Sequence, residues 1–272
     1  MAIMENRKNR RSALITGASS GIGAEFARQL APQGYDLILV ARRKERLDEL
    51  ASELNQAYGI YVDILPADLT EESQIQAVEI HIQENEPLDL LVNNAGFGMH
   101  GKFADIDISK HLTMLQIHDI ACVRLTRAVL PGMLNRKKGG IINVSSISGL
   151  IPLGNITYGT TKAFQVIFSE ALQMELSGTG IRIQALCPGY TYTEFHDKQD
   201  LSGFQRSRLP NFLWTSAEEV VSVSLKGLEK GKVVVVPGTI YRLFASLGRW
   251  TIFASLLRGI AVRIRRNRYA ES

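Results

Sequence analysis

Residues 12–23 read SALITGASSGIG, an apolar run that leads directly into a glycine-rich turn. Residues 12–16 predict a short buried strand, and residues 24–33 after the turn predict a helix that ends at Gly34. This order is typical of a phosphate-binding site, because glycines let a phosphate approach the backbone and the helix N-terminus presents unpaired N–H groups. A tight structural turn is the alternative, since the spacing is GxxxGxG instead of the GxGxxG of the common dinucleotide motif. In this setting nucleotide binding is the favoured interpretation.

Strand-like and helix-like segments alternate along the rest of the chain. Residues 35–41, 60–65, 88–92, 140–145, 181–187 and 232–236 predict strands, and residues 45–57, 71–84, 109–135, 158–176 and 217–230 predict helices. This alternation indicates an α/β fold with a parallel sheet that helices cover on both faces. Ligands of such folds bind at the carboxyl ends of the strands, where Gly17, Arg42, Asp68 and Asn94 all fall. The sequence therefore predicts a ligand site at that edge of the sheet.

The composition is that of an ordinary globular protein, with 45% apolar and 21% charged residues among 272. This length predicts a single domain, which we divide into residues 1–239 and a C-terminal extension of the same domain, residues 240–272. The two cysteines, Cys122 and Cys187, lie far apart in apolar segments, which argues against a disulfide framework and for a reducing compartment. Residues 1–11 are too charged for a secretory signal, so a cytoplasmic location is expected.

Two arginines, Arg42 and Arg43, follow the predicted strand 35–41. In dinucleotide-binding folds an acidic residue near this strand end binds the ribose 2′-hydroxyl of NAD, whereas an arginine accommodates the 2′-phosphate of NADP. The pair therefore favours NADP(H). A solvated basic turn is the alternative interpretation.

Tyr158 and Lys162 stand four residues apart at the beginning of the predicted helix 158–176. Residues i and i+4 lie on one face of a helix, so the ammonium group is expected beneath the phenol. A nearby cation favours the phenolate and would lower the pKa of Tyr158 from its usual value of about 10, which would suit the phenol to donate and accept protons. Taken alone, such a pair is more often a chance feature of a helix surface.

With these segments in order, the chain closely resembles the short-chain dehydrogenase/reductase family over residues 10–240. The resemblance rests on motifs in the family's order: TGASSGIG from Thr16, Asp68, NNAG from Asn93, the serine pair 145–146, YGTTK from Tyr158 and PGYTYT from Pro188. It implies a Rossmann-type, doubly wound parallel sheet of about seven strands. It also implies the NADP(H)-preferring branch, because an arginine at position 42 after a small residue is the family's usual mark of that preference.

The resemblance also implies roles by position. Ser146 would hydrogen-bond the substrate's carbonyl or alcohol, Tyr158 would pass the proton, and Lys162 would lower the pKa of Tyr158 and hold the nicotinamide ribose. The cofactor would be held by the glycine-rich turn, the strand ends and the proline–glycine segment: Gly17, Ser19, Ser20, Gly21, Ile22, Gly23, Arg42, Arg43, Asp68, Leu69, Asn94, Ala95, Gly96, Tyr158, Lys162, Pro188, Gly189 and Thr193. No metal site is predicted.

Two departures from the family pattern leave alternatives open. The loop between Ser146 and Tyr158 is one residue shorter than in most relatives, so Ser145 could be the serine that reaches the site. His118 stands where the family usually carries an asparagine that holds a water linking the lysine to solvent. An imidazole donates and accepts hydrogen bonds and titrates near neutrality, so it could replace the asparagine in a proton relay, although it is bulkier and could displace the water. Retained catalysis is the favoured interpretation.

The function implied is an NADP(H)-dependent reductase or alcohol dehydrogenase that transfers a hydride between the nicotinamide and a carbonyl carbon. Aromatic residues between positions 190 and 214 suggest an apolar substrate such as a fatty-acyl ketone, a steroid or a retinoid, although core packing would explain them almost as well. A cofactor-binding regulatory or scaffolding protein with little turnover is the alternative, supported only by His118. Relatives are commonly dimers or tetramers, so a homodimer or homotetramer is expected by analogy.

The C-terminal residues 240–268 are both apolar and basic, and residues 240–272 carry a net charge of +6. The longest uncharged run, residues 250–257, is far shorter than the ~20 residues that a transmembrane helix needs. One interpretation is a helix or helix pair packed over the substrate site or a subunit interface. The other is an interfacial helix that presses its apolar face into an anionic membrane surface. Nucleic-acid binding is not expected, because the segment is apolar and no base-stacking module is apparent.

Overall fold

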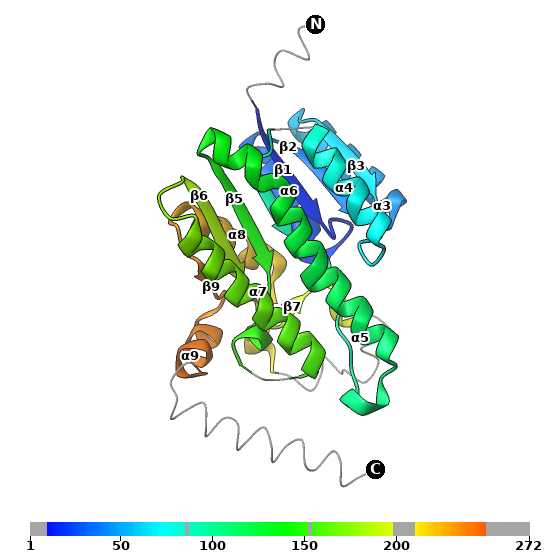
Figure 1. Ribbon diagram of the computed structural model, residues 1–272, viewed down its shortest axis with the longest axis vertical. Helices are drawn as coiled ribbons and strands as arrows, with labels where there is room; N and C mark the ends of the chain where they lie inside the picture. Colours follow the sequence, from blue (N-terminus) through cyan, green and yellow to red (C-terminus); the bar gives the residue numbers. More distant parts are fainter. Residues whose placement is uncertain (1–9, 85–86, 152–153, 198–209, 249–272) are drawn as a thin grey trace, which may run out of the picture.

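Parallel strands form the centre of the protein (Figure 1). The computed structural model describes residues 10–84, 87–151, 154–197 and 210–248. Within these residues one sheet contains, in spatial order, β3 (Val62–Pro66), β2 (Tyr35–Ala41), β1 (Arg11–Thr16), β4 (Leu90–Asn93), β5 (Gly139–Val144), β6 (Ile181–Leu186) and β9 (Val234–Val235). Each of these pairings is parallel. The order runs outward in both directions from β1 and β4, which confirms the predicted doubly wound fold.

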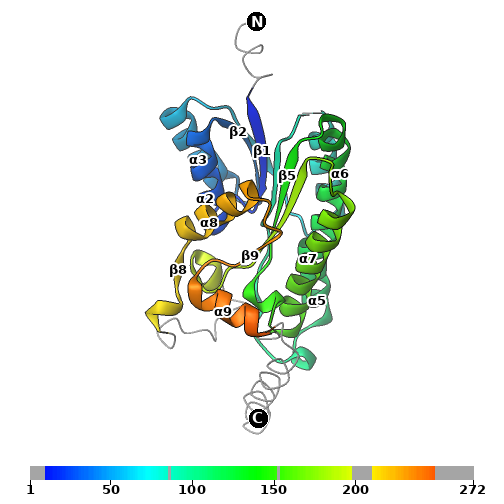
Figure 2. The ribbon, with the colours of Figure 1, turned by 90° about the vertical axis from the view of Figure 1, so that its left-hand side faces the viewer.

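Helices cover both faces of this sheet (Figure 2). One face carries α2 (Gly21–Leu30), α3 (Lys44–Tyr58) and α8 (Ala217–Glu229), and the other carries α4 (Glu72–Glu84), α5 (Ile108–Leu115), α6 (Ala121–Arg136) and α7 (Ile156–Glu175). Each side has its own hydrophobic core, with Phe26 in the first and Ile75 in the second. Ile15 of β1 belongs to the first core and its neighbour Leu14 to the second, because successive side chains of a strand point to opposite faces. The strand is therefore apolar along its whole length, as buried parallel strands are.

The predicted helix 109–135 is divided into three parts. One turn of π-helix, Gln116–Ile120, joins α5 to α6 where the sequence predicts a continuous α-helix. A π turn holds more residues than an α turn, and such turns occur frequently at functional sites. Here the backbone carbonyl of His118, within that turn, accepts a hydrogen bond of 2.8 Å from Gln165 Nε2 of α7. Residues 116–120 contain no glycine or proline, so the helical pattern of the sequence gives no indication of the π turn.

The end of the sheet beyond β6 also differs from the sequence prediction. The strand predicted for residues 232–236 is reduced to β9, which pairs with Ala185 and Leu186 of β6. In addition, β7 (Thr191–Tyr192) and β8 (Thr215–Ser216) form a separate parallel pair. This pair connects the segment after β6 to the residues just before α8. It thereby fixes the proline–glycine segment near the carboxyl end of the sheet.

Helix α9 (Thr239–Gly248) packs on the domain near the carboxyl ends of the strands (Figure 2). Its Tyr241 and Ala245 are buried, and the Tyr241 hydroxyl donates to the carbonyl of Leu213 and accepts a hydrogen bond of 3.1 Å from the N–H of Tyr190. The first turns of the predicted extension therefore contact the domain, and the remainder of residues 240–268 lies outside the described residues. The division between residues 239 and 240 stays a prediction. Among the helices that the structure describes, none is long and apolar enough to cross a bilayer.

Candidate active site

The glycine-rich turn connects β1 to α2 and contacts the residue that follows β4. Gly17 and Gly21 adopt φ angles of 67° and 56°, which glycine tolerates and other residues rarely do. A Cβ on Gly23 would lie 2.4 Å from the carbonyl oxygen of Gly17, so a larger residue does not fit there. Asn94 Nδ2 donates to the carbonyl of Thr16 at 2.8 Å and so holds the turn in place. These glycines leave the backbone accessible for close approach by a ligand.

The segment after β4 is anchored to β1 on one side and to His118 on the other. The backbone N–H groups of Asn94 and Ala95 both donate to Thr16 Oγ1, at 2.9 and 3.0 Å. A Cβ on Gly96 would lie 2.5 Å from His118 Nε2, so the backbone passes directly against the imidazole. The three predicted residues thus lie between the glycine-rich turn and the π turn.

Asp68 and Leu69 follow β3 at the same edge of the sheet. The Asp68 carboxylate accepts hydrogen bonds from the N–H and the hydroxyl of Thr70, at 3.0 and 2.8 Å, and pairs with Arg42 at 3.4 Å. Burial raises the pKa of Asp68, but the hydrogen bonds from Thr70 and the contact with Arg42 outweigh it, so the pKa is lowered. Leu69 and Ile22 pack into the cores on opposite faces of the sheet. Their side chains are therefore packing groups, and they could contact a ligand through the backbone.

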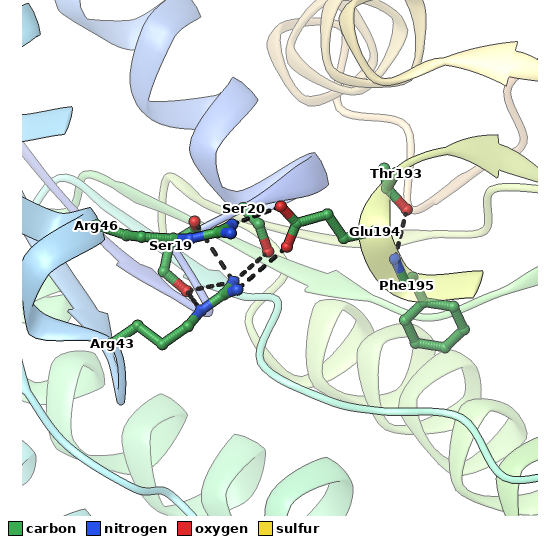
Figure 3. A network of polar contacts seen from close by, with 7 residues as sticks. All are labelled: Ser19, Ser20, Arg43, Arg46, Thr193, Glu194 and Phe195. Atoms are coloured by element: carbon green, nitrogen blue, oxygen red, sulfur yellow. Dashed lines mark hydrogen bonds and ion pairs between the residues drawn. The ribbon is translucent and has the colours of Figure 1, made fainter. Parts of the chain in front are cut away.

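The two arginines after β2 make different contacts, and Figure 3 shows those of Arg43. Arg43 donates to the side chains of Ser19, at 3.0 Å, and Ser20, at 2.7 Å, on the glycine-rich turn. It also donates through Nη1 to the carboxylate of Glu194 at 3.1 Å. The side chain of Arg42 is 66% exposed and pairs with the aspartate after β3. Arg43 is thus the arginine in contact with the turn, a distinction that two adjacent arginines in a sequence do not reveal.

The adjacent serines after β5 have different partners. The Ser145 hydroxyl is buried and donates to the backbone carbonyl of Lys162 at 2.7 Å. Ser146 Oγ accepts from the N–H of Ser148 at 3.1 Å, and an interaction with the Ser146 side chain acts to lower the pKa of Tyr158. Of the two serines that the sequence left open, Ser146 is therefore the one beside the tyrosine hydroxyl.

Tyr158 lies in the first turn of α7, where Asn155 caps the helix by accepting a hydrogen bond of 3.1 Å from its N–H. Burial of the hydroxyl raises the pKa of Tyr158 to about 12, and the interaction with Ser146 opposes this only in part, although the residue as a whole keeps some exposure. Lys162 Nζ lies 5.8 Å from the centre of the tyrosine ring. The expectation of a lowered phenol pKa is therefore wrong for this arrangement, because desolvation outweighs the favourable contacts.

The ammonium group of Lys162 is buried beneath the end of β5. It donates to the carbonyl of Val144 at 2.8 Å and to Oε1 of Gln165 at 3.1 Å. Burial lowers the pKa of Lys162 to about 8, and the neighbouring Cys122 and Asp119 oppose this shift. The group remains mostly protonated at neutral pH, with two uncharged oxygens as acceptors.

Gln165 is a residue of the site that the sequence analysis missed. Its Oε1 accepts from Lys162, and its Nε2 donates to the backbone carbonyl of His118 at 2.8 Å. It therefore connects the ammonium group to the π turn, at the position where the family resemblance implies a bound water. The signal in the sequence is slight: a polar residue three positions after Lys162 in a helix segment that is otherwise mostly apolar.

Both ring nitrogens of the fully buried His118 are engaged. Nε2 accepts from the N–H of Phe97 at 3.2 Å, so we assign the proton to Nδ1, which donates to Thr161 Oγ1 at 2.8 Å. Thr161 Oγ1 in turn donates to the backbone carbonyl of Tyr158 at 2.9 Å. Burial and the charge of Lys162 hold the pKa of His118 well below 6.5, so the ring is neutral at pH 7. The backbone carbonyl of His118 connects to Lys162 through Gln165. A proton relay through the imidazole ring stays a prediction.

The proline–glycine segment after β6 contacts both the glycine-rich turn and α9. Pro188 is buried, and a Cβ on Gly189 would lie 2.1 Å from the ring of Tyr241, so α9 closes directly on this segment. A Cβ on Gly21 would lie 3.1 Å from the Cβ of Thr193. The last group of predicted residues is therefore brought to the same edge of the sheet as the others.

Known proteins are similar to this chain. The family described as short chain dehydrogenase matches residues 11–202. The very-long-chain 3-oxoacyl-CoA reductase of Anas platyrhynchos is 37% identical over 187 residues, which make up 67% of this chain and 60% of that protein. A solved structure of a short-chain dehydrogenase from Sphingobium yanoikuyae in complex with NADPH has a TM-score of 0.80 and 36% identity, covering 92% of this chain and 94% of that one. The bulky-bulky ketone specific alcohol dehydrogenase from Comamonas testosteroni has a TM-score of 0.76 and 32% identity, covering 97% of this chain and 95% of that one.

The depressed pKa of His118 predicts how stability depends on pH. Above pH 6.5 the ring is neutral in both the folded and the unfolded chain, so its contribution is fully present. As the pH falls below 6.5, the unfolded chain gains a proton that the folded chain does not take up. The free energy of unfolding should then fall by about 1.4 kcal/mol per pH unit until the folded pKa is reached. Urea unfolding of the wild type and His118→Gln from pH 7 to about 5 measures this, and the variant should lose stability less steeply. Parallel curves would mean that His118 does not titrate in this way.

Proposed function

The chain belongs to the short-chain dehydrogenase family, and we infer that it is an oxidoreductase that uses NADP(H). The family match over residues 11–202 includes the four predicted catalytic residues, Ser146, Tyr158, Lys162 and His118. The Sphingobium relative, 36% identical and in complex with NADPH, supports the choice of cofactor. The contacts of Arg43 with both serines of the glycine-rich turn support it as well.

The observation that carries the proposed reaction is that the side chains of Tyr158 and Ser146 lie beside one another at the carboxyl end of the sheet. With its pKa raised to about 12, the Tyr158 hydroxyl is protonated at neutral pH. It is therefore suited to donate a proton to a substrate oxygen that gains negative charge during reduction. Ser146 would hydrogen-bond the same oxygen and orient it toward the phenol. Lys162 would hold the nicotinamide ribose, as the family resemblance implies.

The residues around the carboxyl edge fit an NADP(H) molecule. The diphosphate would lie on the glycine-rich turn, and the 2′-phosphate on Arg43 together with Ser19 and Ser20. The remaining predicted contacts would come from the first turn of α2, at Ile22, and from the segments that follow the strands: Arg42, Asp68, Leu69, Asn94, Ala95, Gly96, Pro188, Gly189 and Thr193. The cofactor supplies the hydride when bound, and the protein binds and orients the reactants and supplies the proton.

Aromatic side chains, one of them beside Tyr158, support an apolar substrate. The ring of Phe195 lies 6.0 Å from that of Tyr158, and the rings of Tyr190 and Tyr192 pack on Trp214 at 5.5 and 5.0 Å. The Anas relative is named for a very-long-chain 3-oxoacyl-CoA and the Comamonas relative for bulky ketones. The proposed substrate is therefore a carbonyl compound, or the corresponding alcohol, with large apolar groups, such as a fatty-acyl ketone, a steroid or a retinoid.

Exposed apolar side chains on α5, α6 and α7 support self-association. They are large residues at the surface of three helices that cover the same face of the sheet (Figure 2): Ile108, Leu112, Leu115, Val123, Phe164, Ile167 and Met174. Burial of apolar surface contributes about 25 cal/mol per Å². A second copy of the chain packed on this face would gain that contribution, and a homodimer through these helices is the proposed assembly.

A peripheral contact with an anionic membrane through residues 240–268 also stays a proposal. The structure describes this segment only as far as Gly248. Its described exposed apolar side chains are Leu243, 60% exposed, and Phe244, 43% exposed. A cytoplasmic location also stays a proposal.

Replacement of the proton donor tests the reaction. Tyr158→Phe should lower the rate of NADPH oxidation at least by the roughly 10²–10⁴-fold typical of a general acid, while NADPH still binds. The assay uses a panel of aliphatic ketones, acyl thioesters, steroids and retinoids. Tyr58→Phe, which alters an exposed tyrosine at the end of α3, is the control. A near wild-type rate in Tyr158→Phe would remove the tyrosine from the mechanism. Tight NADPH binding by the wild type without oxidation over the whole panel would instead indicate a regulatory protein.

Replacement of the arginines tests the cofactor. A charged hydrogen bond contributes roughly 1.5–3 kcal/mol, so Arg43→Ala should weaken NADPH binding about ten- to a hundredfold and leave NADH binding nearly unchanged. Arg42→Ala should have a smaller effect, because its side chain is 66% exposed. Isothermal titration with both cofactors measures these affinities. Equal losses for NADPH and NADH would contradict a 2′-phosphate site at Arg43.

Introduction of a charge on α7 tests the assembly. Ile167 is 63% exposed, so Ile167→Glu should leave the folded chain intact but place a carboxylate in the proposed interface. Sedimentation should then reveal a monomer where the wild type is a dimer or larger. Ile80→Glu, on the exposed surface of α4, is the control and should keep the wild-type state. An unchanged assembly in Ile167→Glu would move the interface elsewhere.

A further inference from the structure

Glu194 occupies an anion site built by two arginines, one of which also contacts the serines of the glycine-rich turn (Figure 3). Its carboxylate accepts hydrogen bonds from Arg43, at 3.1 Å, and from Arg46. The same Arg43 guanidinium donates to the side chains of Ser19 and Ser20, at 3.0 and 2.7 Å. Guanidinium groups that converge with hydroxyl groups bind a phosphate as readily as a carboxylate. The site therefore has the chemistry of a phosphate site, and a side chain of the protein fills it.

The pairing joins distant parts of the chain. Arg43 and Arg46 lie at the start of α3, whereas Glu194 lies 151 positions after Arg43, in the segment that follows β6 and β7. Hydrogen bonds from Arg46 and Arg43 lower the pKa of Glu194 despite some opposing effect of burial, so the side chain is a carboxylate at neutral pH. Both ion pairs remain accessible to solvent, with 40–45% of each side chain exposed. Ion pairs of this kind are weak, so another anion could replace the carboxylate.

The residues on either side of Glu194 connect the anion site to the catalytic tyrosine. Thr193 packs against the glycine-rich turn, since its Cβ lies 3.1 Å from where a Cβ on Gly21 would be. The ring of Phe195 lies 6.0 Å from that of Tyr158, and the N–H of Phe195 donates to Thr193 Oγ1 at 3.3 Å. Residues 193–195 therefore extend from the phosphate-binding end of the site to its proton-donating end.

From these contacts we propose that Glu194 is a displaceable anion, which competes with the 2′-phosphate of the cofactor for Arg43 and Arg46 and, when displaced, releases residues 193–195 from the glycine-rich turn. This proposal rests on the proposed NADP(H)-dependent function. A phosphate and the carboxylate repel one another, so the carboxylate would weaken the binding of a phosphate to the same guanidinium groups. A 2′-hydroxyl has no charge to exchange for the carboxylate. The protein thereby distinguishes a phosphorylated dinucleotide from an unphosphorylated one. Only the phosphorylated one would release residues 193–195, which lie beside Tyr158.

Two nucleotides that differ in one phosphate test the competition. Adenosine 2′,5′-bisphosphate and adenosine 5′-monophosphate are titrated calorimetrically into the full chain and into Glu194→Gln, which keeps the shape of the side chain and removes its charge. Because exposed ion pairs are weak, the preference for the bisphosphate over the monophosphate should rise about two- to tenfold in the variant. Asp48→Asn is the matched control: it removes a carboxylate of α3, the helix that carries Arg46, where Asp48 pairs with Lys44 at 2.7 Å. This variant should keep the wild-type preference.

Amide hydrogen exchange tests the release of the segment. In the wild type the bisphosphate should accelerate exchange at residues 193–195 and the monophosphate should not. In Glu194→Gln these amides should exchange rapidly before any nucleotide is added. An unchanged preference in the variant, an equal gain for both nucleotides, or unchanged exchange in the wild type would each overturn the role of Glu194.

The same data separate this proposal from the function on which it rests. If the bisphosphate binds the wild type and Glu194→Gln no better than the monophosphate, the NADP(H) site itself is wrong. If both proteins prefer the bisphosphate to the same extent, the NADP(H) site stands and only the competition by Glu194 fails.

Discussion

The buried ammonium group of Lys162 sets the conditions that the surrounding elements meet. A cation removed from water is stable only if hydrogen-bond acceptors surround it. The carbonyl of Val144 at the end of β5 supplies one acceptor and Gln165 Oε1 supplies another. Gln165 itself donates to the backbone carbonyl of His118 within the π turn. The imidazole ring of His118 accepts a hydrogen bond from the N–H of Phe97. The end of β5, helix α7 and the π turn are thus joined through one charge.

Burial shifts the two groups of the YxxxK pair in opposite directions, because it disfavours the charged form of each. It raises the pKa of Tyr158 to about 12 and lowers that of Lys162 to about 8. At neutral pH the pair therefore consists of a neutral acid and a cation. This is the combination expected of a site that donates a proton to a substrate oxygen while a fixed positive charge lies nearby.

The two ends of the site use charge in different ways. Lys162 is buried and donates to two neutral acceptors, which hold it in place. Arg43 and Glu194 are about 40–45% exposed, and their contact is one that solvent and other anions can replace. The proton-donating end thus has a rigid arrangement, whereas the phosphate-binding end can exchange partners. A bound dinucleotide would span both, and residues 193–195, which lie between them, are where we propose that the two ends are coupled.

The sequence by itself determined the alternation of strands and helices, the glycine-rich turn and the helix that carries Tyr158 and Lys162, because each follows from residue spacing along a short stretch. It also predicted the edge of the sheet at which the site residues gather. The choice between Ser145 and Ser146, the contact of Arg43 with the turn, the π turn at His118 and the roles of Gln165 and Glu194 came only from the tertiary structure. Each of these depends on a contact between residues far apart in the chain, and adjacent serines or arginines have the same local pattern until their distant partners are in place.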